Sequence, residues 1–72
     1  MDLMKFVKRN VVLVDDNGKE WRGFVVGFTS AINNDEEYDS IQIETPQFRK
    51  GLVEFFENEI ISIEIVSKNH LV

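Results

Sequence analysis

Apolar and polar residues alternate over short stretches of this chain, and turn-forming residues interrupt them at intervals. Val12 and Val14 belong to one such stretch, an Asp-Asn-Gly sequence follows it, and an apolar run then extends over residues 21–28. Alternation with a period of two predicts β-strands. Asn17 and Gly18 predict a tight hairpin turn between the two strands, because both residue types accept the positive φ that two-residue turns require.

The second strand carries Gly23 and Gly27 among valines and aromatic residues. Glycine inside a strand marks a bulge, a sharp bend or the close approach of another backbone. A strand bent at these positions can contribute to two sheets at once, which is how a short chain closes a small barrel. We therefore expect the replacement of Gly23 by Val to destabilise the fold.

Three more strands are predicted downstream, over residues 40–45, 52–56 and 60–66. Pro46 ends the first of them, because proline cannot donate a hydrogen bond to a neighbouring strand. The connecting residues 29–39 and 45–51 are polar or rich in turn-forming residues, which is typical of loops. The acidic residues of the first loop do not have the spacing of a calcium loop, so no metal site is predicted there.

A short helix over residues 2–8 is predicted ahead of the strands. Asp2 can cap its first turn, Lys8 and Arg9 lie at the end that the helix dipole makes negative, and the apolar side chains fall on one stripe. We expect this helix to cover the open end of a barrel; a helix for a membrane surface or a partner is the alternative. Residues 67–72 are expected to form a frayed tail.

These elements predict one all-β domain over residues 1–72, a five-stranded, strongly bent, SH3-like small barrel with a short N-terminal helix. At the edges of an open barrel, the apolar last two strands would expose unpaired backbone groups. A head-to-tail ring of identical copies would pair these edges. We expect Ile63→Lys to break folding or assembly, because it places a charge on the apolar face that Ile63 shares with Ile61 and Ile65.

Composition narrows the classes of function. The net charge of −5 argues against broad electrostatic attraction to nucleic acid or anionic membranes, although a ring can concentrate a few cations on one face. The absence of cysteine excludes disulfides and thiolate sites. Because the first residues include Asp2 and no long apolar core, and no run reaches membrane-spanning length, we expect a cytoplasmic protein without membrane contact.

Residues suited to catalysis are scarce in this sequence. The single histidine, His70, lies in the predicted tail, and no serine stands beside a candidate base. Gly23 and Gly27 lie inside a strand, so they do not form a phosphate-binding loop. We therefore predict no enzyme, no catalytic residue and no cofactor.

The second strand and its flanks carry the spacing of a known motif, in Gly18, Gly23, Val25, Gly27-Phe28 and Ile32-Asn33. In this pattern the chain resembles the first motif of the Sm/LSm superfamily, which includes bacterial, archaeal and phage Sm-like proteins. The second motif aligns with residues 52–63. Thr29 stands where the family has Asp, and Phe56-Glu57 stand where it has Arg-Gly. The resemblance implies an Sm-like barrel with an N-terminal helix, assembled into a ring through the fourth strand of one subunit and the fifth of the next.

The resemblance also implies that the ring binds single-stranded RNA, in RNA processing or regulation. The motif Asn, here Asn33, bonds the edge of a base while a loop residue stacks on it. Phe56 in place of Arg removes a cation but can itself stack on a base, whereas Glu57 repels phosphate. The candidate RNA contacts are Ile32, Asn33, Asn34, Tyr38, Arg49, Lys50 and Phe56. Each has a structural alternative: shaping a loop, capping the barrel, a solvated turn, or a core or interface position.

Two other functions stay open. The ring can act as an oligomeric scaffold or protein-interaction module without binding RNA, which the acidity of the chain and the missing Arg favour and Asn33 opposes. A monomeric SH3-like barrel could instead use Trp21, Phe24 or Tyr38 in a peptide groove. A molecular mass equal to that of one chain would favour this last function.

Overall fold

The structure is a computed structural model that describes residues 1–34 and 37–67, the side chain of Asn34 excepted. Its elements follow in the order η1 (Leu3–Phe6), β1 (Asn10–Asp15), β2 (Glu20–Thr29), α1 (Ala31–Asn34), β3 (Ser40–Glu44), β4 (Leu52–Phe56), η2 (Glu57–Glu59) and β5 (Ile60–Ile65). The five predicted strands are confirmed. The loop predicted over residues 29–39 contains the single helical turn α1, and most of the predicted tail lies outside the described residues.

The N-terminal helix is shorter and tighter than predicted. It is a 3-10 helix of four residues, Leu3–Phe6, rather than a helix over residues 2–8. Val7 is extended and Lys8 takes a φ of +62°, so the backbone leaves the helix there. The side chains of Leu3 and Phe6 are buried in the core, which explains why so short a helix forms here.

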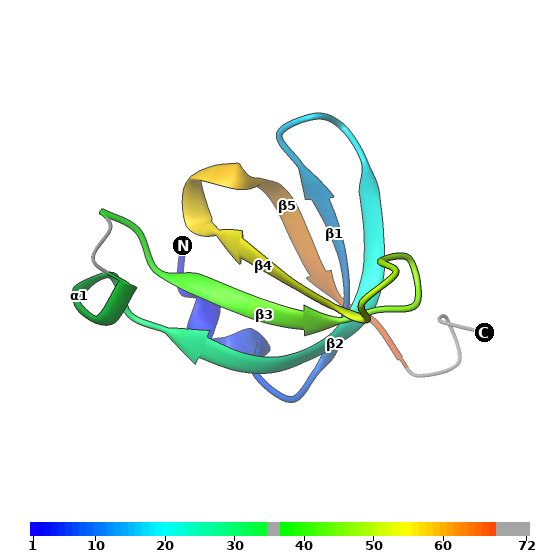
Figure 1. Ribbon diagram of the computed structural model, residues 1–72, viewed down its shortest axis with the longest axis horizontal. Helices are drawn as coiled ribbons and strands as arrows, with labels where there is room; N and C mark the ends of the chain where they lie inside the picture. The colour runs from blue at the N-terminus through cyan, green and yellow to red at the C-terminus, as the bar shows by residue number, and fades with distance from the viewer. Residues whose placement is uncertain (35–36, 68–72) are drawn as a thin grey trace.

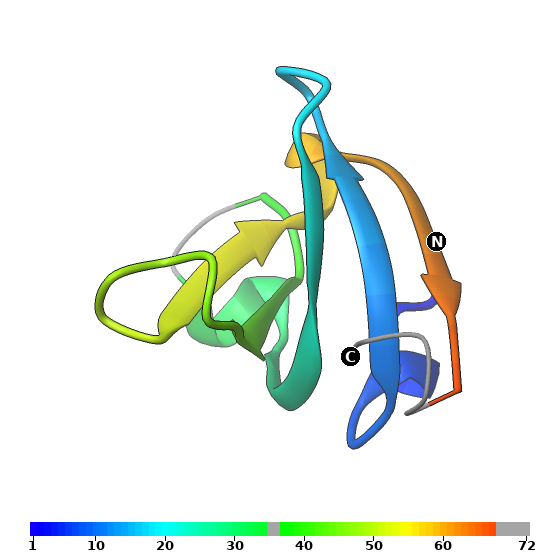
Figure 2. The ribbon, with the colours of Figure 1, turned by 90° about the vertical axis from the view of Figure 1, so that its right-hand side faces the viewer.

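All five strands belong to one antiparallel sheet in the order β4-β3-β2-β1-β5. Figures 1 and 2 show that this sheet is strongly curled and that η1 lies against one of its open ends. The sheet is not closed into a barrel, since β4 and β5 form its two ends. Among the described residues the fold is mostly β, with little helix.

The strand β2 bends as its two glycines predict. The register between β2 and β3 shifts between Val25 and Gly27, which is a bulge. At Gly23 the backbone of β3 comes so close that a Cβ would lie 2.6 Å from Ile43 Cγ2 and closer still to the carbonyl oxygen of Glu44. Gly23 thus permits close approach, and its φ lies outside the positive range.

The hairpin turn between β1 and β2 is one residue longer than the predicted two-residue turn. The N–H of Gly18 donates to the carbonyl of Asp15 at 2.9 Å, and the N–H of Asp15 donates to the carbonyl of Lys19 at 3.0 Å. Only Gly18 has a positive φ in this turn, +82°. This is a three-residue loop in which a β-turn is followed by a left-handed glycine, so Asn17 keeps an ordinary backbone conformation.

The core lies on the concave side of the curled sheet. Its buried side chains are Leu3, Phe6, Val11, Leu13, Trp21, Val25, Ile41, Ile43, Phe55 and Ile60. β1 alternates strictly between buried and half-buried residues, and its buried face carries Val11, Leu13 and Asp15 rather than Val12 and Val14. The apolar face predicted for Ile61, Ile63 and Ile65 packs against the core only at Ile63. A register shift between β1 and β5 leaves Ile61 without a partner in β1, so Ile60 is buried and Ile61 is exposed.

Candidate functional site

The structure separates the predicted RNA contacts into two groups at opposite ends of β3. Ser40 begins β3 and pairs with both Thr29 of β2 and Phe56 of β4. The turn α1, with Ile32 and Asn33, and the end of β4, with Phe56, therefore lie at one end of the sheet. Figure 1 shows α1 at that end and the loop between β3 and β4 at the other.

Arg49 and Lys50 lie in the loop between β3 and β4, remote from Asn33 in the fold. Both side chains are exposed. Because β3 is antiparallel to its neighbours, the connection that precedes it and the one that follows it must leave opposite ends of the strand. The two basic residues and Asn33 therefore do not form one pocket within a single chain.

The end of the sheet at α1 presents apolar side chains to solvent. Ile32 is 92% exposed, Tyr38 is exposed as well, and Phe56 is half-buried. The loop is held by Asp39, whose carboxylate accepts a hydrogen bond from the N–H of Ala31 at 2.8 Å. Asp39 was not predicted as a structural residue, because it stands eight positions from the group that it binds.

Acidic side chains surround this end of the sheet. The carboxylate of Glu54 accepts hydrogen bonds from Ser40 Oγ at 2.8 Å and from Gln42 Nε2 at 3.1 Å. That of Glu59 accepts one from the N–H of Phe56 at 2.9 Å. The carboxylate of Glu57 lies 3.3 Å from the N-terminal ammonium. Carboxylates this close to Phe56 disfavour the approach of phosphate.

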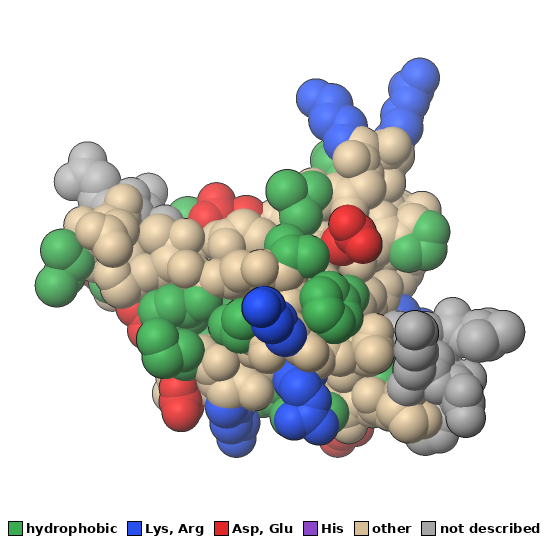
Figure 3. Space-filling view, turned by 90° about the horizontal axis from the view of Figure 1, so that it is seen from below, with side chains coloured by type: hydrophobic (Ala, Val, Ile, Leu, Met, Phe, Trp, Pro, Cys, Tyr) green, Lys and Arg blue, Asp and Glu red, His purple; other side chains and the backbone are tan. Residues whose placement is uncertain are grey.

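Cationic side chains gather elsewhere. Lys5, Lys8 and Arg9 are exposed around η1 and the start of β1, beside the exposed Met4. Figure 3 shows the face of the molecule seen from below, where Lys and Arg side chains lie among apolar ones. The first nine residues carry three cations against one acid, although the whole chain is acidic. The charge of this molecule is therefore unevenly distributed.

A buried carboxylate organises the opposite end of β2. The indole N–H of Trp21 donates to Asp15 Oδ2 at 2.9 Å, and the backbone N–H groups of Asn17 and Lys19 both donate to Asp15 Oδ1 at 2.9 Å. The bond from Trp21, helped by the two backbone bonds and the Lys19 charge, lowers the pKa of Asp15 although burial acts in the opposite direction. The sequence indicated a turn here but not the Asp15–Trp21 pair.

Trp21 is not available for a peptide groove. Its ring is buried, it packs edge-on against Phe55 at 5.4 Å between ring centroids, and Lys19 Nζ lies 4.1 Å from its centroid on the outer side. The hypothesis of a groove that includes Trp21 is therefore wrong. Phe24 is half-buried in β2, and Tyr38 is exposed in the loop that precedes β3.

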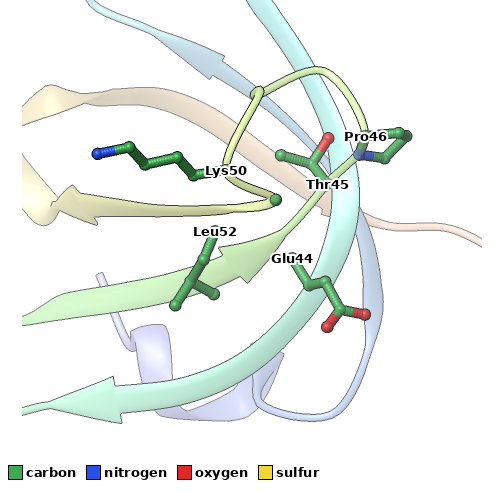
Figure 4. Close-up of a pocket in the computed structure, with 6 residues that line it drawn as sticks. Glu44, Thr45, Pro46, Lys50 and Leu52 are labelled. Atoms are coloured by element: carbon green, nitrogen blue, oxygen red, sulfur yellow. The ribbon is translucent and has the colours of Figure 1, made fainter.

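Two open hollows flank the loop between β3 and β4. One, of about 540 Å³, is lined by Glu44, Thr45, Pro46, Lys50, Gly51 and Leu52. Figure 4 shows the side chains of Glu44 and Leu52 on the same side of the sheet, as their pairing requires. The other, of about 500 Å³, is lined by Glu20, Arg22, Gly23, Phe24, Glu44, Pro46 and Gln47. Of the predicted RNA contacts, these hollows include Lys50 alone.

Within residues 1–34 and 37–67, no group of three or more His, Cys, Asp or Glu side chains is placed to hold a metal ion. None of the helices described is long and apolar enough to cross a membrane. Comparisons with models of protein families, with curated proteins and with solved structures found no significant match.

Proposed function

We propose that this protein is an Sm-like module that assembles with copies of itself, β4 of one copy pairing with β5 of the next to form a ring. The observation that carries this proposal is the state of the two end strands. Each leaves one row of backbone groups outside the sheet, and each carries apolar side chains in solvent. Leu52 of β4 is 51% exposed, and Ile61 and Ile65 of β5 are 67% and 39% exposed.

An exposed apolar edge strand is a hazard for aggregation unless another chain covers it. Because β4 and β5 stand at opposite ends of one sheet, pairing between them continues the sheet from one copy into the next. Such a contact joins two different surfaces, and repetition with rotation closes it into a ring. The pairing would also cover Ile61 and Ile65, which have no neighbour beyond the edge of β5 in the described chain.

We propose that the ring serves mainly as a protein scaffold. The end of the sheet at which the resemblance expects RNA is lined by Glu54, Glu57 and Glu59. Phosphate contacts by Lys and Arg supply most of the non-specific affinity for nucleic acid, and acidic groups oppose it. The surface of the ring is therefore better suited to protein partners.

Binding of single-stranded RNA is the second candidate function, and the exposure of Ile32 beside Asn33 favours it. Bases stack on exposed apolar and aromatic side chains while an amide reads their edges. Fluorescence anisotropy with U-rich and A-rich RNA at low and near-physiological salt tests this function. Binding that prefers one RNA and is weakened by Asn33→Ala would support it. A lack of binding at low salt, where electrostatic attraction is strongest, would exclude it.

The assembly itself is tested by native mass spectrometry and by light scattering after size exclusion. We expect a mass several times that of the 8.4 kDa chain. Ile61→Lys should reduce it to that of one chain, because the charge lies on the edge that pairs. Ile61 is preferred to Ile63 for this test, because Ile63 packs against the core and a charge there would also disturb folding.

The matched control is Ile32→Lys, which places the same charge on an exposed isoleucine that belongs to neither β4 nor β5. This variant should keep the mass of the assembly. A wild-type chain that stays monomeric at high concentration would contradict the proposal. An Ile61→Lys variant that remains fully assembled would equally contradict it, by showing that β5 is not the contact.

A further inference from the structure

The sheet has a third free edge, along the first half of β2, and side chains close it. On one side, Trp21 and Gly23 pair with Leu13 and Val11 of β1. On the other side, pairing with β3 begins only at Phe24, because β3 ends at its partner Glu44. The backbone of Glu20 and Arg22 faces this other side, where no strand runs in the described chain.

The loop between β3 and β4 folds over this edge and supplies the missing partners. Gln47 Nε2 donates to the carbonyl of Glu20 at 2.8 Å, and the N–H of Arg22 donates to Gln47 Oε1 at 2.5 Å. Thr45 Oγ1 donates to the carbonyl of Arg22 at 2.7 Å. One side-chain amide and one hydroxyl thus make the hydrogen bonds that a neighbouring strand would make.

We propose that Gln47, supported by Thr45, determines which edges of this protein pair with other copies. It does so by covering the free edge of the first half of β2, so that no strand of a second copy can pair there. Thr45 is almost fully buried, and its hydroxyl also accepts a hydrogen bond from the N–H of Gln47 at 3.2 Å. This bond holds in place the clip, the name we give to the Gln47 and Thr45 side chains that cover the free edge of β2. In the described chain the last N–H of β4, that of Phe56, donates to Glu59 Oε1, whereas the rest of β4 and β5 has no such cover. This inference rests on the proposed assembly through those two strands.

The loss of the Gln47 side chain uncovers the carbonyl of Glu20 and the N–H of Arg22, while Thr45 still bonds the carbonyl of Arg22. An extended strand of a second copy can bind these groups by adding to the sheet. Such a contact is not the one between β4 and β5, so it branches the assembly. Gln47→Ala is suited to the test because the side chain is exposed and leaves no cavity.

The first readout is amide hydrogen exchange, followed by NMR. In Gln47→Ala, exchange at Arg22 should rise at least tenfold, whereas Trp21 and Gly23, which pair with β1, should keep their protection. Asn17→Ala is the control, because it removes an exposed amide whose side chain has no hydrogen bond to the described chain. It should leave exchange at Arg22 unchanged. Unchanged exchange at Arg22 in Gln47→Ala would overturn the inference.

The second readout is association. Because the chain has no cysteine, Glu20→Cys gives a single site for a spin label in both backgrounds. Gln47→Ala should form species larger than the wild-type assembly, with label-to-label contacts between copies that the wild type lacks. A Gln47→Ala variant with the wild-type mass distribution and no such contacts would overturn the inference while leaving the ring intact. A monomeric wild type beside an associating Gln47→Ala would contradict the ring and support the clip.

Discussion

The two ends of β2 are built in different ways. At its start, the carboxylate of Asp15 receives hydrogen bonds from Trp21 and from two backbone N–H groups, and Gln47 covers the free edge. At its end, the chain passes into α1, where Ile32 extends into solvent. The first end is held by interlocking contacts, whereas the second presents side chains outward. We infer that substitutions at the first end cost stability and that those at the second end affect binding.

The largest effect is expected for Gly23→Val, in the first half of β2. A Cβ there meets the backbone of Glu44 and the side chain of Ile43, neither of which can move without displacing β3. We expect the free energy of unfolding to fall by more than about 3 kcal/mol, or the chain not to fold. Urea unfolding followed by circular dichroism measures this change.

Gly27→Ala is the matched substitution in the second half of β2. Its Cβ meets Gln42 Oε1 at 2.8 Å, an atom at the end of a side chain rather than backbone, so we expect a loss of about 1 kcal/mol or less. Equal losses for the two glycine variants would contradict the difference between the two halves. A Gly23→Val variant that melts at the wild-type temperature would contradict the close approach of β3.

A smaller, pH-dependent effect is expected for Asp15→Asn. The lowered pKa of Asp15 means that its ionised form stabilises the fold. This contribution is fully present above the unfolded-state pKa, about 3.9, and is lost as the pH falls through the lower folded-state value. Thermal unfolding should therefore show the variant to be less stable than the wild type at pH 7, with the difference shrinking below about pH 4.

Trp21→Phe separates the indole bond from the other bonds of Asp15. If that bond is the main cause of the lowered pKa, the double variant Asp15→Asn, Trp21→Phe should lose less stability than the sum of the two single variants. Strict additivity would show that the pair contributes nothing. A gap between wild type and Asp15→Asn that stays constant from pH 7 to pH 2 would also contradict the role of the carboxylate.

The smallest effect on stability is expected at the other end of β2. Ile32→Ser removes an apolar side chain that is almost fully exposed, so the free energy of unfolding should change by no more than about 0.5 kcal/mol. The same urea titration measures it. A loss beyond about 1 kcal/mol would show that Ile32 packs against its own chain and would remove it from the candidate binding surface.

The strands were predictable because their signal is local. Alternation of apolar and polar residues placed β4 at its observed bounds and β3 and β5 within one residue of theirs. Gly23 and Gly27 indicated the bend of β2 for the correct physical reasons, close approach and a bulge. The N-terminal helix was overestimated because its apolar stripe fits a single 3-10 turn as well as a longer helix.

The contacts that organise the site were less accessible to sequence reasoning. Asn33 and Arg49 lie at opposite ends of β3 because the strands are antiparallel. This separation depends on the order of the strands in the sheet, which no local sequence pattern gives. The bonds from Gln47 to β2 join residues 25 and 27 positions apart, and no local pattern in a polar loop reveals which strand it will cover. The Asp15–Trp21 bond spans six positions across a turn whose composition already accounted for the Asp.

Trp21 is the single tryptophan of the chain, and it sits where the hairpin, the core and the Lys19 ammonium meet. Its indole is bonded to a carboxylate and shielded from water, so its emission depends on the integrity of this one corner. Trp21 therefore serves as an intrinsic fluorescent probe. Its emission reports on the start of β2, where Asp15 and Gln47 make their contacts, and not on the end that leads into α1. Binding at α1 should leave that emission unchanged, whereas opening of the hairpin should shift it to longer wavelength.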